Sequence, residues 1–210
     1  MGTREYDETY SACAAYFGTA PSGWLSRFLP QDGGRRVLDL GSGQGRNALH
    51  LGRLGYRVTA VDSSGEAIRE LREKAEREGL PVRAVHEDIR TFSLGAGTYD
   101  VVVAVTVLCH LPPHEVEPVA GRLVRALRPE GLLLAEEFSP RDPGRMGETD
   151  ASEFAPLVNN YFSAEEMQGL FRPLQPVLCR ELEVVDTTHG RPHRHGLVRY
   201  AGRREKLKSE

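Results

Sequence analysis

Short apolar runs alternate with longer amphipathic segments along most of this chain. The runs are rich in Val, Leu and Ala, as expected of buried strands, and many of the segments between them space their apolar side chains as a helix does. Strands and helices that alternate in this way form a mostly parallel sheet with crossover helices. We therefore predict a doubly wound α/β fold. Its strands are expected at residues 36–40, 57–61, 82–86, 99–107, 132–138, 177–185 and 197–201.

Capping residues mark the predicted helices. The clearest helix covers residues 63–79, where Ser63 is the expected N-cap and Glu66 completes a capping box. Gly79 supplies the stop. The other helices are expected to begin near Pro113, at a second capping box of Ser163 with Glu166, and within residues 6–29.

The composition excludes several classes of protein. A formal charge of −3 over 210 residues provides no global field for a polyanion, so nucleic acid is not an expected partner. No stretch approaches the roughly 20 apolar residues of a membrane-spanning helix. Three widely spaced cysteines do not suit a disulfide framework or a thiolate zinc site. We expect a cytoplasmic protein of undefined oligomeric state.

The strand at 36–40 leads directly into a glycine-rich turn. Gly41, Gly43 and Gly45 precede a helix that should begin near Asn47. Glycine allows the backbone to turn sharply and to approach a ligand without a Cβ in the way. Asp62 ends the next predicted strand, where a carboxylate can accept hydrogen bonds from ribose hydroxyls. These features predict a nucleotide-type site.

Spacing and charge then separate the possible nucleotides. Dinucleotide-binding proteins use G-x-G-x-x-G to place a diphosphate at a helix N-terminus. This chain has G-x-G-x-G instead, with Asp39 just before the turn. A carboxylate there would repel an anion and attract an ammonium group. The ligand is therefore expected to carry positive charge.

An ordered set of motifs resembles that of class I S-adenosylmethionine-dependent methyltransferases. The set consists of residues 39–45, Asp62, residues 87–89, and residues 99–103 leading to 108–111, and the resemblance covers roughly residues 35–140. It implies a Rossmann-like methyltransferase fold with a seven-stranded, mostly parallel sheet whose last strand is antiparallel. The remainder is similar, more weakly, to the subgroup that includes tellurite-resistance and thiopurine methyltransferases.

The resemblance also implies roles for single residues. The glycine loop would lie under the methionine part of S-adenosylmethionine, Asp62 would hold the ribose, and Asp88 would meet the adenine amino group. Ile89 would pack on the base. The cofactor-binding residues that we predict are Asp39, Gly41, Ser42, Gly43, Gly45, Asp62, Ser63, Asp88, Ile89, Val105 and Tyr16.

One methyltransferase domain is expected over residues 1–202, followed by a flexible tail at 203–210. Within it we expect an N-terminal helical lid at 1–30, a cofactor-binding core at 35–140 and a substrate-side segment at 141–202.

Three histidines crowd the predicted loop between the last two strands. By topology this loop lies beside the expected methyl acceptor. We predict that His193 and His195 bind the acceptor or accept its proton, and that Arg194 orients an anionic acceptor. A solvated hairpin loop is the alternative. A metal site is not expected, because no carboxylate or Cys lies at the usual short ligand spacing.

Two further residues are candidates for the site. His110 follows the fourth predicted strand, where it would either contact the acceptor or close the loop by a structural hydrogen bond. The aromatic residues near the N-terminus could form a lid over a cationic sulfur, and among them we favour Tyr16.

The function that these features predict is methyl transfer to a small molecule. We expect in-line displacement, because the methyl group of a sulfonium is already activated. A non-catalytic S-adenosylmethionine-binding module and an NAD(P)-dependent oxidoreductase are the alternatives. The identity of the acceptor, and whether it needs a general base, do not follow from the sequence.

Overall fold

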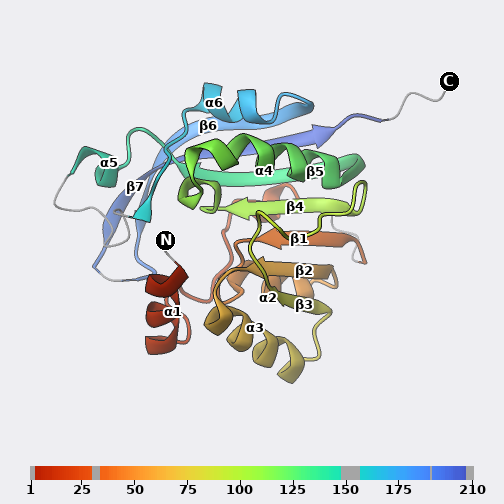
Figure 1. Cartoon of the computed structure of the whole chain (residues 1–210), viewed down its shortest axis with the longest axis vertical. Helices are drawn as coiled ribbons and strands as arrows, with labels where there is room; N and C mark the ends of the chain where they lie inside the picture. Colours follow the sequence, from red (N-terminus) through yellow and green to blue (C-terminus); the bar gives the residue numbers. More distant parts are fainter. Residues whose placement is uncertain (1–2, 30–33, 148–156, 190, 207–210) are drawn as a thin grey trace.

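Seven strands form one sheet in the order β3-β2-β1-β4-β5-β7-β6 (Figure 1). The computed structural model describes residues 3–29, 34–147, 157–189 and 191–206. All pairings from β3 to β5 are parallel, whereas β7 runs antiparallel to both β5 and β6. The strands are β1 (Arg36–Leu40), β2 (Arg57–Asp62), β3 (Val82–His86), β4 (Tyr99–Val105), β5 (Leu127–Phe138), β6 (Leu174–Asp186) and β7 (His193–Arg204).

This topology confirms the predicted α/β fold with an antiparallel last strand. The predicted ends of several strands differ from the observed ones. Strand β5 begins at Leu127 rather than at residue 132, and β6 and β7 are longer than expected. Their ladder, which has a register shift between Pro176 and Leu178, extends to a pair of Asp186 with His193, so polar residues assigned to a loop belong to strands. Backbone pairing with a neighbouring strand overrides the polar composition there.

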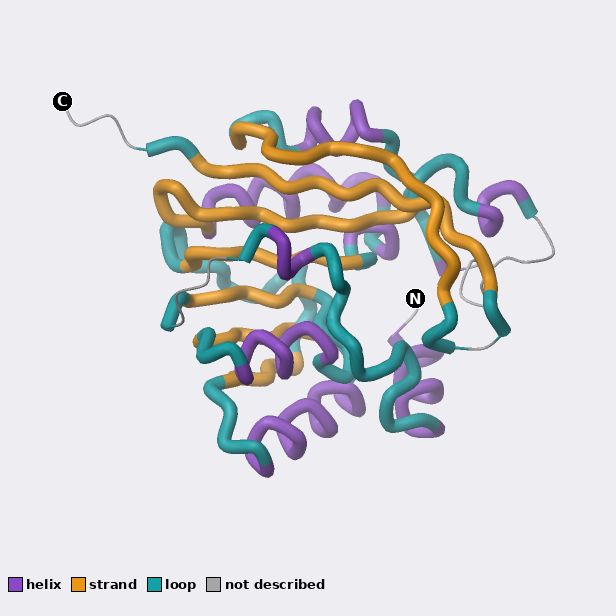
Figure 2. Tube along the Cα trace, turned by 180° about the vertical axis from the view of Figure 1, so that it is seen from behind, coloured by secondary structure: helices purple, strands orange, loops and turns teal. Residues whose placement is uncertain are grey.

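Helices cover both faces of the sheet. Figure 1 shows α4 on one face, and Figure 2 shows α2 and α3 from behind, on the other. Among the described helices, none combines the length and the apolar character that crossing a bilayer requires. The helices are α1 (Thr3–Ala12), α2 (Arg46–Arg53), α3 (Gly65–Arg77), α4 (Pro113–Ala126), α5 (Pro143–Met146) and α6 (Ala164–Leu170), with two short 3-10 turns, η1 (Leu25–Arg27) and η2 (Leu108–His110).

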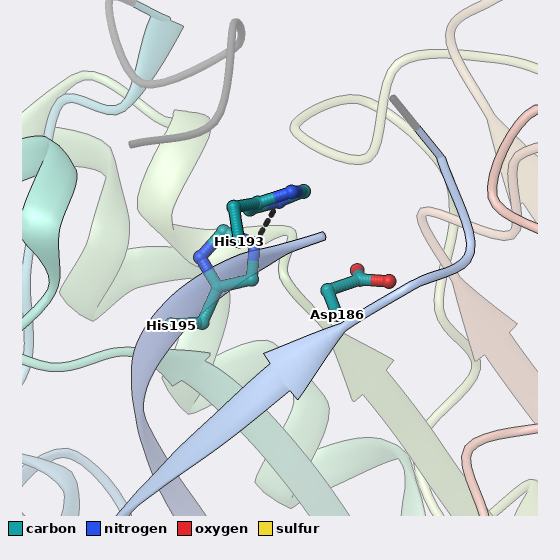
Figure 3. Close-up of side chains that lie close together, drawn as sticks. All are labelled: Asp186, His193 and His195. Atoms are coloured by element: carbon teal, nitrogen blue, oxygen red, sulfur yellow. Dashed lines mark hydrogen bonds between the residues drawn. The ribbon is translucent and has the colours of Figure 1, made fainter. Parts of the chain in front are cut away.

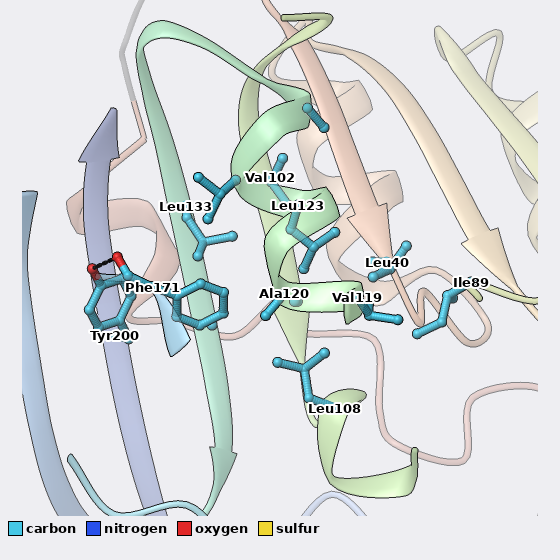
Figure 4. Close-up of a cluster of buried hydrophobic side chains, with 14 of the residues drawn as sticks. Leu40, Ile89, Val102, Leu108, Val119, Ala120, Leu123, Leu133, Phe171 and Tyr200 are labelled. Atoms are coloured by element: carbon cyan, nitrogen blue, oxygen red, sulfur yellow. Dashed lines mark hydrogen bonds between the residues drawn. The ribbon is translucent and has the colours of Figure 1, made fainter. Parts of the chain in front are cut away.

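Strand alternation divides the core into two layers. Val102 on β4 and Leu133 on β5 point to the face where Leu123 of α4 and Phe171, just after α6, pack (Figure 4). The neighbouring Val103 points to the opposite face, into a second layer that includes residues of η1, α2 and α3. Successive side chains of a strand point to opposite faces, so strands buried on both sides are continuously apolar.

The predicted helices are present with different boundaries. Helix α3 is capped by Ser64, whose side chain accepts a hydrogen bond from the Ala67 amide, so the predicted Ser63 cap is wrong. The capping box at Ser163 and Glu166 is confirmed in α6. Two helical segments, α1 and η1, lie within residues 3–29.

A buried carboxylate fastens the turn after β4. Glu137 on β5 accepts hydrogen bonds from the backbone amides of Val107, Leu108 and Cys109. Burial raises the pKa of Glu137 to about 7, against the effect of these three donors. Because Glu137 holds η2 to the neighbouring strand, it fixes the position of the backbone that leads to His110.

Helix α2 starts from a left-handed glycine. Gly45 is its N-cap at φ +88°, a conformation that side chains disfavour. A Cβ at this position would overlap the side chain of Leu71 on α3. Glycine at position 45 therefore permits both the turn and the close packing of α2 against α3.

Replacement of Gly45 tests this packing. We expect Gly45→Ala to lower the free energy of unfolding by about 2 to 4 kcal/mol, because a Cβ adds overlap to backbone strain. Gly79→Ala is the matched control, since Gly79 also has a positive φ but faces open space, and it should cost only about 1 kcal/mol. Urea unfolding of both variants measures the difference, and equal losses would contradict the account.

Candidate active site

A cavity of about 510 Å³ lies at the carboxyl ends of the central parallel strands. Its wall is built by the residues that follow β1, β2, β3 and β4, and α1 lies beside it (Figure 1). The strand order reverses between β1 and β4, where the loops diverge and leave a crevice. The volume is within the roughly 300 to 1,000 Å³ typical of small-molecule sites.

Most of the predicted cofactor-binding residues line this cavity. Asp39 and Tyr16 do not. The backbone amide of Tyr16 donates to Gln44 Oε1 and its ring lies against Phe17, outside the cavity lining. The predicted residues that line it are Gly41, Ser42, Gly43, Gly45, Asp62, Ser63, Asp88, Ile89, Val105 and His110.

Asp62 connects the glycine loop to the start of α3. One carboxylate oxygen accepts a hydrogen bond from the Gly43 amide at 2.8 Å, and the other accepts from the Ser64 amide at 2.8 Å. Burial raises the pKa of Asp62 despite these two donors. Each oxygen retains a second lone pair that can accept from a ligand hydroxyl. The carboxylate can therefore shape the loop and bind a ligand at once.

Asp39 is placed differently from the sequence-based expectation. Asp39 is 2% exposed and does not line the cavity. Its carboxyl group is therefore not placed to attract a cationic ligand there, contrary to the prediction. Burial raises its pKa to about 7, and one of its oxygens has no hydrogen-bond partner among the described residues. Two charged residues that the sequence analysis did not assign to the site, Arg46 and Arg90, line the cavity, and Arg46 follows the glycine motif directly.

Asp88 lines the cavity next to Ile89 but is already paired. Both of its carboxylate oxygens accept hydrogen bonds from the guanidinium of Arg90. This contact holds the pKa of Asp88 below its usual value. The arrangement keeps the carboxylate charged and oriented at the cavity wall.

The N-terminal segment forms the aromatic wall of the cavity. Tyr6 and Tyr10 of α1 and the nearby Phe17 line it. Asp7 fixes α1 in this position by accepting hydrogen bonds from the Ser64 hydroxyl and the Glu66 amide, at the N-terminus of α3. Of the N-terminal aromatic residues considered for a lid, Tyr6, Tyr10 and Phe17 line the cavity and Tyr16 does not.

A second cavity, of about 340 Å³, adjoins the first. It lies over one face of β5, β6 and β7, where Glu136, Phe138 and Leu197 are among its lining. Glu136 forms an ion pair with Arg199. The guanidinium of Arg199 also lies 5.6 Å from the centre of the Trp24 ring. The residues that line both cavities, and therefore mark their junction, are Tyr6, Phe17, Arg46, Thr106 and His110.

The structure separates the three residues predicted to act on the acceptor. His193 and His195 are buried on the same face of β7, and His195 lines the second cavity. Arg194 points to the opposite face, as strand alternation requires, and is exposed with Glu183 3.7 Å away. The structure therefore does not bring Arg194 to the face that carries His193 and His195. His193 and His195 belong to a strand and not to a solvated loop.

His110 is held between two partners at the junction. Its Nδ1 lies 3.0 Å from the carbonyl oxygen of Leu157, and its Nε2 lies 3.1 Å from the hydroxyl of Tyr6. The carbonyl can only accept, so Nδ1 carries the hydrogen and Nε2 accepts from Tyr6. Burial lowers the pKa of His110, which favours this neutral form. The structure thus shows a positioning contact for His110.

Comparisons with known proteins agree with this site. Residues 37–131 match a family model described as a methyltransferase domain. The chain is 43% identical over 105 residues to the ubiquinone biosynthesis O-methyltransferase of Methylocella silvestris. The matched stretch covers 49% of this chain and 39% of that protein. The chain spans about a third of the length of several other curated relatives.

Solved structures share the fold over more of the chain. TehB from Haemophilus influenzae superimposes with a TM-score of 0.75 at 21% identity, covering 95% of this chain and 67% of that one. The 1,6-didemethyltoxoflavin-N1-methyltransferase of Burkholderia thailandensis, with bound S-adenosylhomocysteine, has a TM-score of 0.62 at 23% identity, covering 83% and 72%. Residues 37–131 therefore contain a methyltransferase domain, and the chain around them shares the fold of these solved structures.

The cavity at β1 and β4 has donors and acceptors that suit S-adenosylmethionine, the cofactor that the sequence predicts. Ser42 lines the cavity, and its hydroxyl is buried without a hydrogen-bond partner within the described residues. A buried hydroxyl of this kind is costly unless a ligand satisfies it. The carboxylates of Asp62 and Asp88 and the cation of Arg46 complete the polar lining.

The buried carboxyl of Asp39 makes a testable contribution to stability. Because its folded pKa is raised to about 7, the fold favours the protonated form. Its contribution is therefore fully present below the unfolded pKa and is lost as the pH rises through about 7. Between about pH 5 and pH 8, the free energy of unfolding of the wild type should fall by about 2 kcal/mol more than that of Asp39→Asn. Urea unfolding across this range measures the difference, and parallel pH profiles would contradict the assignment.

Proposed function

We propose that this protein is a methyltransferase, which transfers the methyl group of S-adenosylmethionine to a small molecule bound in the second cavity. The observation that carries the proposal is the junction of the two cavities at Tyr6, Phe17, Arg46, Thr106 and His110. Two adjoining cavities can hold a donor and an acceptor in line with the bond that breaks, and such alignment supplies much of the catalysis that an activated methyl requires.

The walls of the first cavity suggest how the cofactor is held. Asp62 would accept hydrogen bonds from the ribose, and Asp88 with Ile89 would receive the adenine. The guanidinium of Arg46 would pair with the carboxylate of the methionine part. The Ser42 hydroxyl would gain the partner that it lacks among the described residues. When bound, the cofactor supplies a methyl group activated by a positive sulfur.

The junction would stabilise that positive charge and exclude water. The rings of Tyr6 and Phe17 line it, and a cation is attracted to a ring face by roughly 0.5 to 2 kcal/mol. The hydrogen bond from the Tyr6 hydroxyl to His110 Nε2 keeps Tyr6 in place. Thr106 holds a positive φ of 47° at the junction, and strained non-glycine residues of this kind concentrate at functional sites.

The second cavity supports a compact polar acceptor. Glu136 and Arg199 neutralise one another on its floor, and Phe138 and Leu197 provide apolar surface. His195 lines the cavity, where we propose that its ring packs against the acceptor, with His193 beside it. This built second cavity favours an enzyme over a module that only senses the cofactor. A cytoplasmic location and the absence of a nucleic-acid substrate remain predictions from the sequence.

Loss of Asp62 tests the cofactor site. Asp62→Ala should weaken S-adenosylhomocysteine binding by about 10- to 100-fold, because a charged acceptor is removed. Glu87→Ala is the control, since Glu87 is a nearby acidic residue that does not line the cavity. Calorimetric titration measures both affinities, and circular dichroism checks that each variant folds. An unchanged affinity in Asp62→Ala would refute the assignment.

An acceptor screen tests the reaction. Release of S-adenosylhomocysteine is measured with thiols, metalloid oxyanions, halides, phenols and amines as acceptors. With the best acceptor, Val184→Trp should reduce kcat/KM by about 100-fold or more, because a large ring fills the second cavity. Val177→Trp on the same strand is exposed and should have little effect. Equal activity of the two variants would show that the acceptor binds elsewhere.

A further inference from the structure

The imidazole rings of His193 and His195 direct the same nitrogen at each other. Their Nε2 atoms are 3.0 Å apart, and a dashed line marks this contact in Figure 3. The two residues alternate with Arg194 on β7, so they share a face of the sheet. Asp186 lies opposite His193 on β6, and cross-strand partners also share a face. The β6–β7 register therefore gathers two imidazoles and a carboxylate beside the second cavity.

Hydrogen bonds to the other ring nitrogens define the tautomers. His193 Nδ1 lies 2.8 Å from the carbonyl oxygen of Arg191, and His195 Nδ1 lies 3.0 Å from Asp142 Oδ2. Carbonyl and carboxylate oxygens only accept, so each Nδ1 carries a hydrogen. In a neutral imidazole the other nitrogen, Nε2, then carries no hydrogen and presents a lone pair. Two lone pairs 3.0 Å apart repel, so the arrangement requires a cation between them.

We propose that this cation is a divalent transition-metal ion of the zinc class, bound by Nε2 of His193, Nε2 of His195 and the carboxylate of Asp186. The three ligand atoms lie within 4.8 Å of one another. Tetrahedral zinc with Zn–N bonds of 2.0 to 2.1 Å separates two nitrogens by about 3.3 Å. The observed 3.0 Å is only a few tenths of an ångström shorter. Three protein ligands leave a fourth position for water or another ligand.

The surrounding hydrogen bonds are those of a metal site. Histidine ligands usually donate their second ring N–H to a carboxylate or a backbone carbonyl, which fixes the ring. Asp142 and the Arg191 carbonyl fill these two roles here. Asp142 is itself held by the amides of Gly144 and Gly196 and is 4% exposed. The rings are therefore oriented by groups that do not depend on the ion.

The prediction of no metal site rests on spacing along the chain, where no carboxylate or Cys lies at short ligand spacing from the histidines. Strand pairing supplies the carboxylate instead, because Asp186 on β6 lies opposite His193 on the neighbouring strand β7. His189 adds a further nitrogen close by, with its Nδ1 3.5 Å from Asp186 Oδ2. Because Asp186 and His195 also line the second cavity, an ion at this position would lie at its wall. Metal binding at these residues does not depend on the proposed methyl transfer.

Cobalt titration tests the proposal with a direct spectroscopic signal. The full chain, without an affinity tag, is stripped of metal with a chelator and titrated with Co²⁺, and Zn²⁺ is then added as competitor. We expect one Co²⁺ per chain with the intense visible bands of tetrahedral coordination, lost when Zn²⁺ displaces it. His193→Gln and His195→Gln should weaken binding by on the order of 100-fold, and Asp142→Asn by on the order of tenfold through its ring contact.

Two variants guard against false outcomes. His114→Gln removes an exposed histidine and should bind Co²⁺ as the wild type does. Asp186→Asn removes a ligand at a partly exposed position and can still accept the Thr188 hydrogen bonds, so loss of binding there does not reflect misfolding. Absence of saturable binding, or equal binding in the ligand variants, would overturn the proposal and leave a shared proton as the bridging cation.

The same samples separate this inference from the proposed function. Metal-free protein should bind S-adenosylhomocysteine with unchanged affinity, because the two sites share none of their proposed binding residues. Failure of S-adenosylhomocysteine binding with normal Co²⁺ binding would refute the methyltransferase proposal and leave the metal site intact. The reverse result would refute the metal site alone.

Discussion

Parallel strands bring their carboxyl ends to one edge of a sheet, and the site of this protein depends on that constraint. The order reverses between β1 and β4, so the loops after these strands diverge and leave a crevice. The glycine loop, Asp62, Asp88 and Val105 all reach this crevice because each follows or ends a parallel strand. Buried contacts such as the Glu137 carboxylate on the amides after β4 fix the backbone at the edge of this crevice.

The antiparallel strand β7 builds the other half of the site. Its insertion between β5 and β6 continues the sheet beyond the crevice and gives a floor for the second cavity. On that floor, strand alternation selects which residues face the cavity: His195, Leu197 and Arg199 do, whereas Arg194 faces away. The N-terminal helix α1, fixed by Asp7, closes the junction between the two cavities with Tyr6.

The sequence predicted the parts of the site that local motifs encode. The glycine loop and the acidic strand ends follow from spacing, and the loop-lining glycines and Asp62 lie at the cavity as expected. The residues that were misplaced depend on tertiary geometry. Asp39 points into the core, Tyr6 replaces Tyr16 because α1 docks on α3, and the β6–β7 register brings Asp186 to His193. None of these three arrangements leaves a periodic signal in the sequence.

The central claim is that the cofactor fills the crevice with its sulfur at the junction of the two cavities. A crystal structure of the protein with S-adenosylhomocysteine tests it most directly. The account predicts adenine beside Asp88 and Ile89, ribose at Asp62, and the sulfur among Tyr6, Phe17 and Thr106. A nucleoside bound in the second cavity, or a sulfur turned away from the junction, would contradict it.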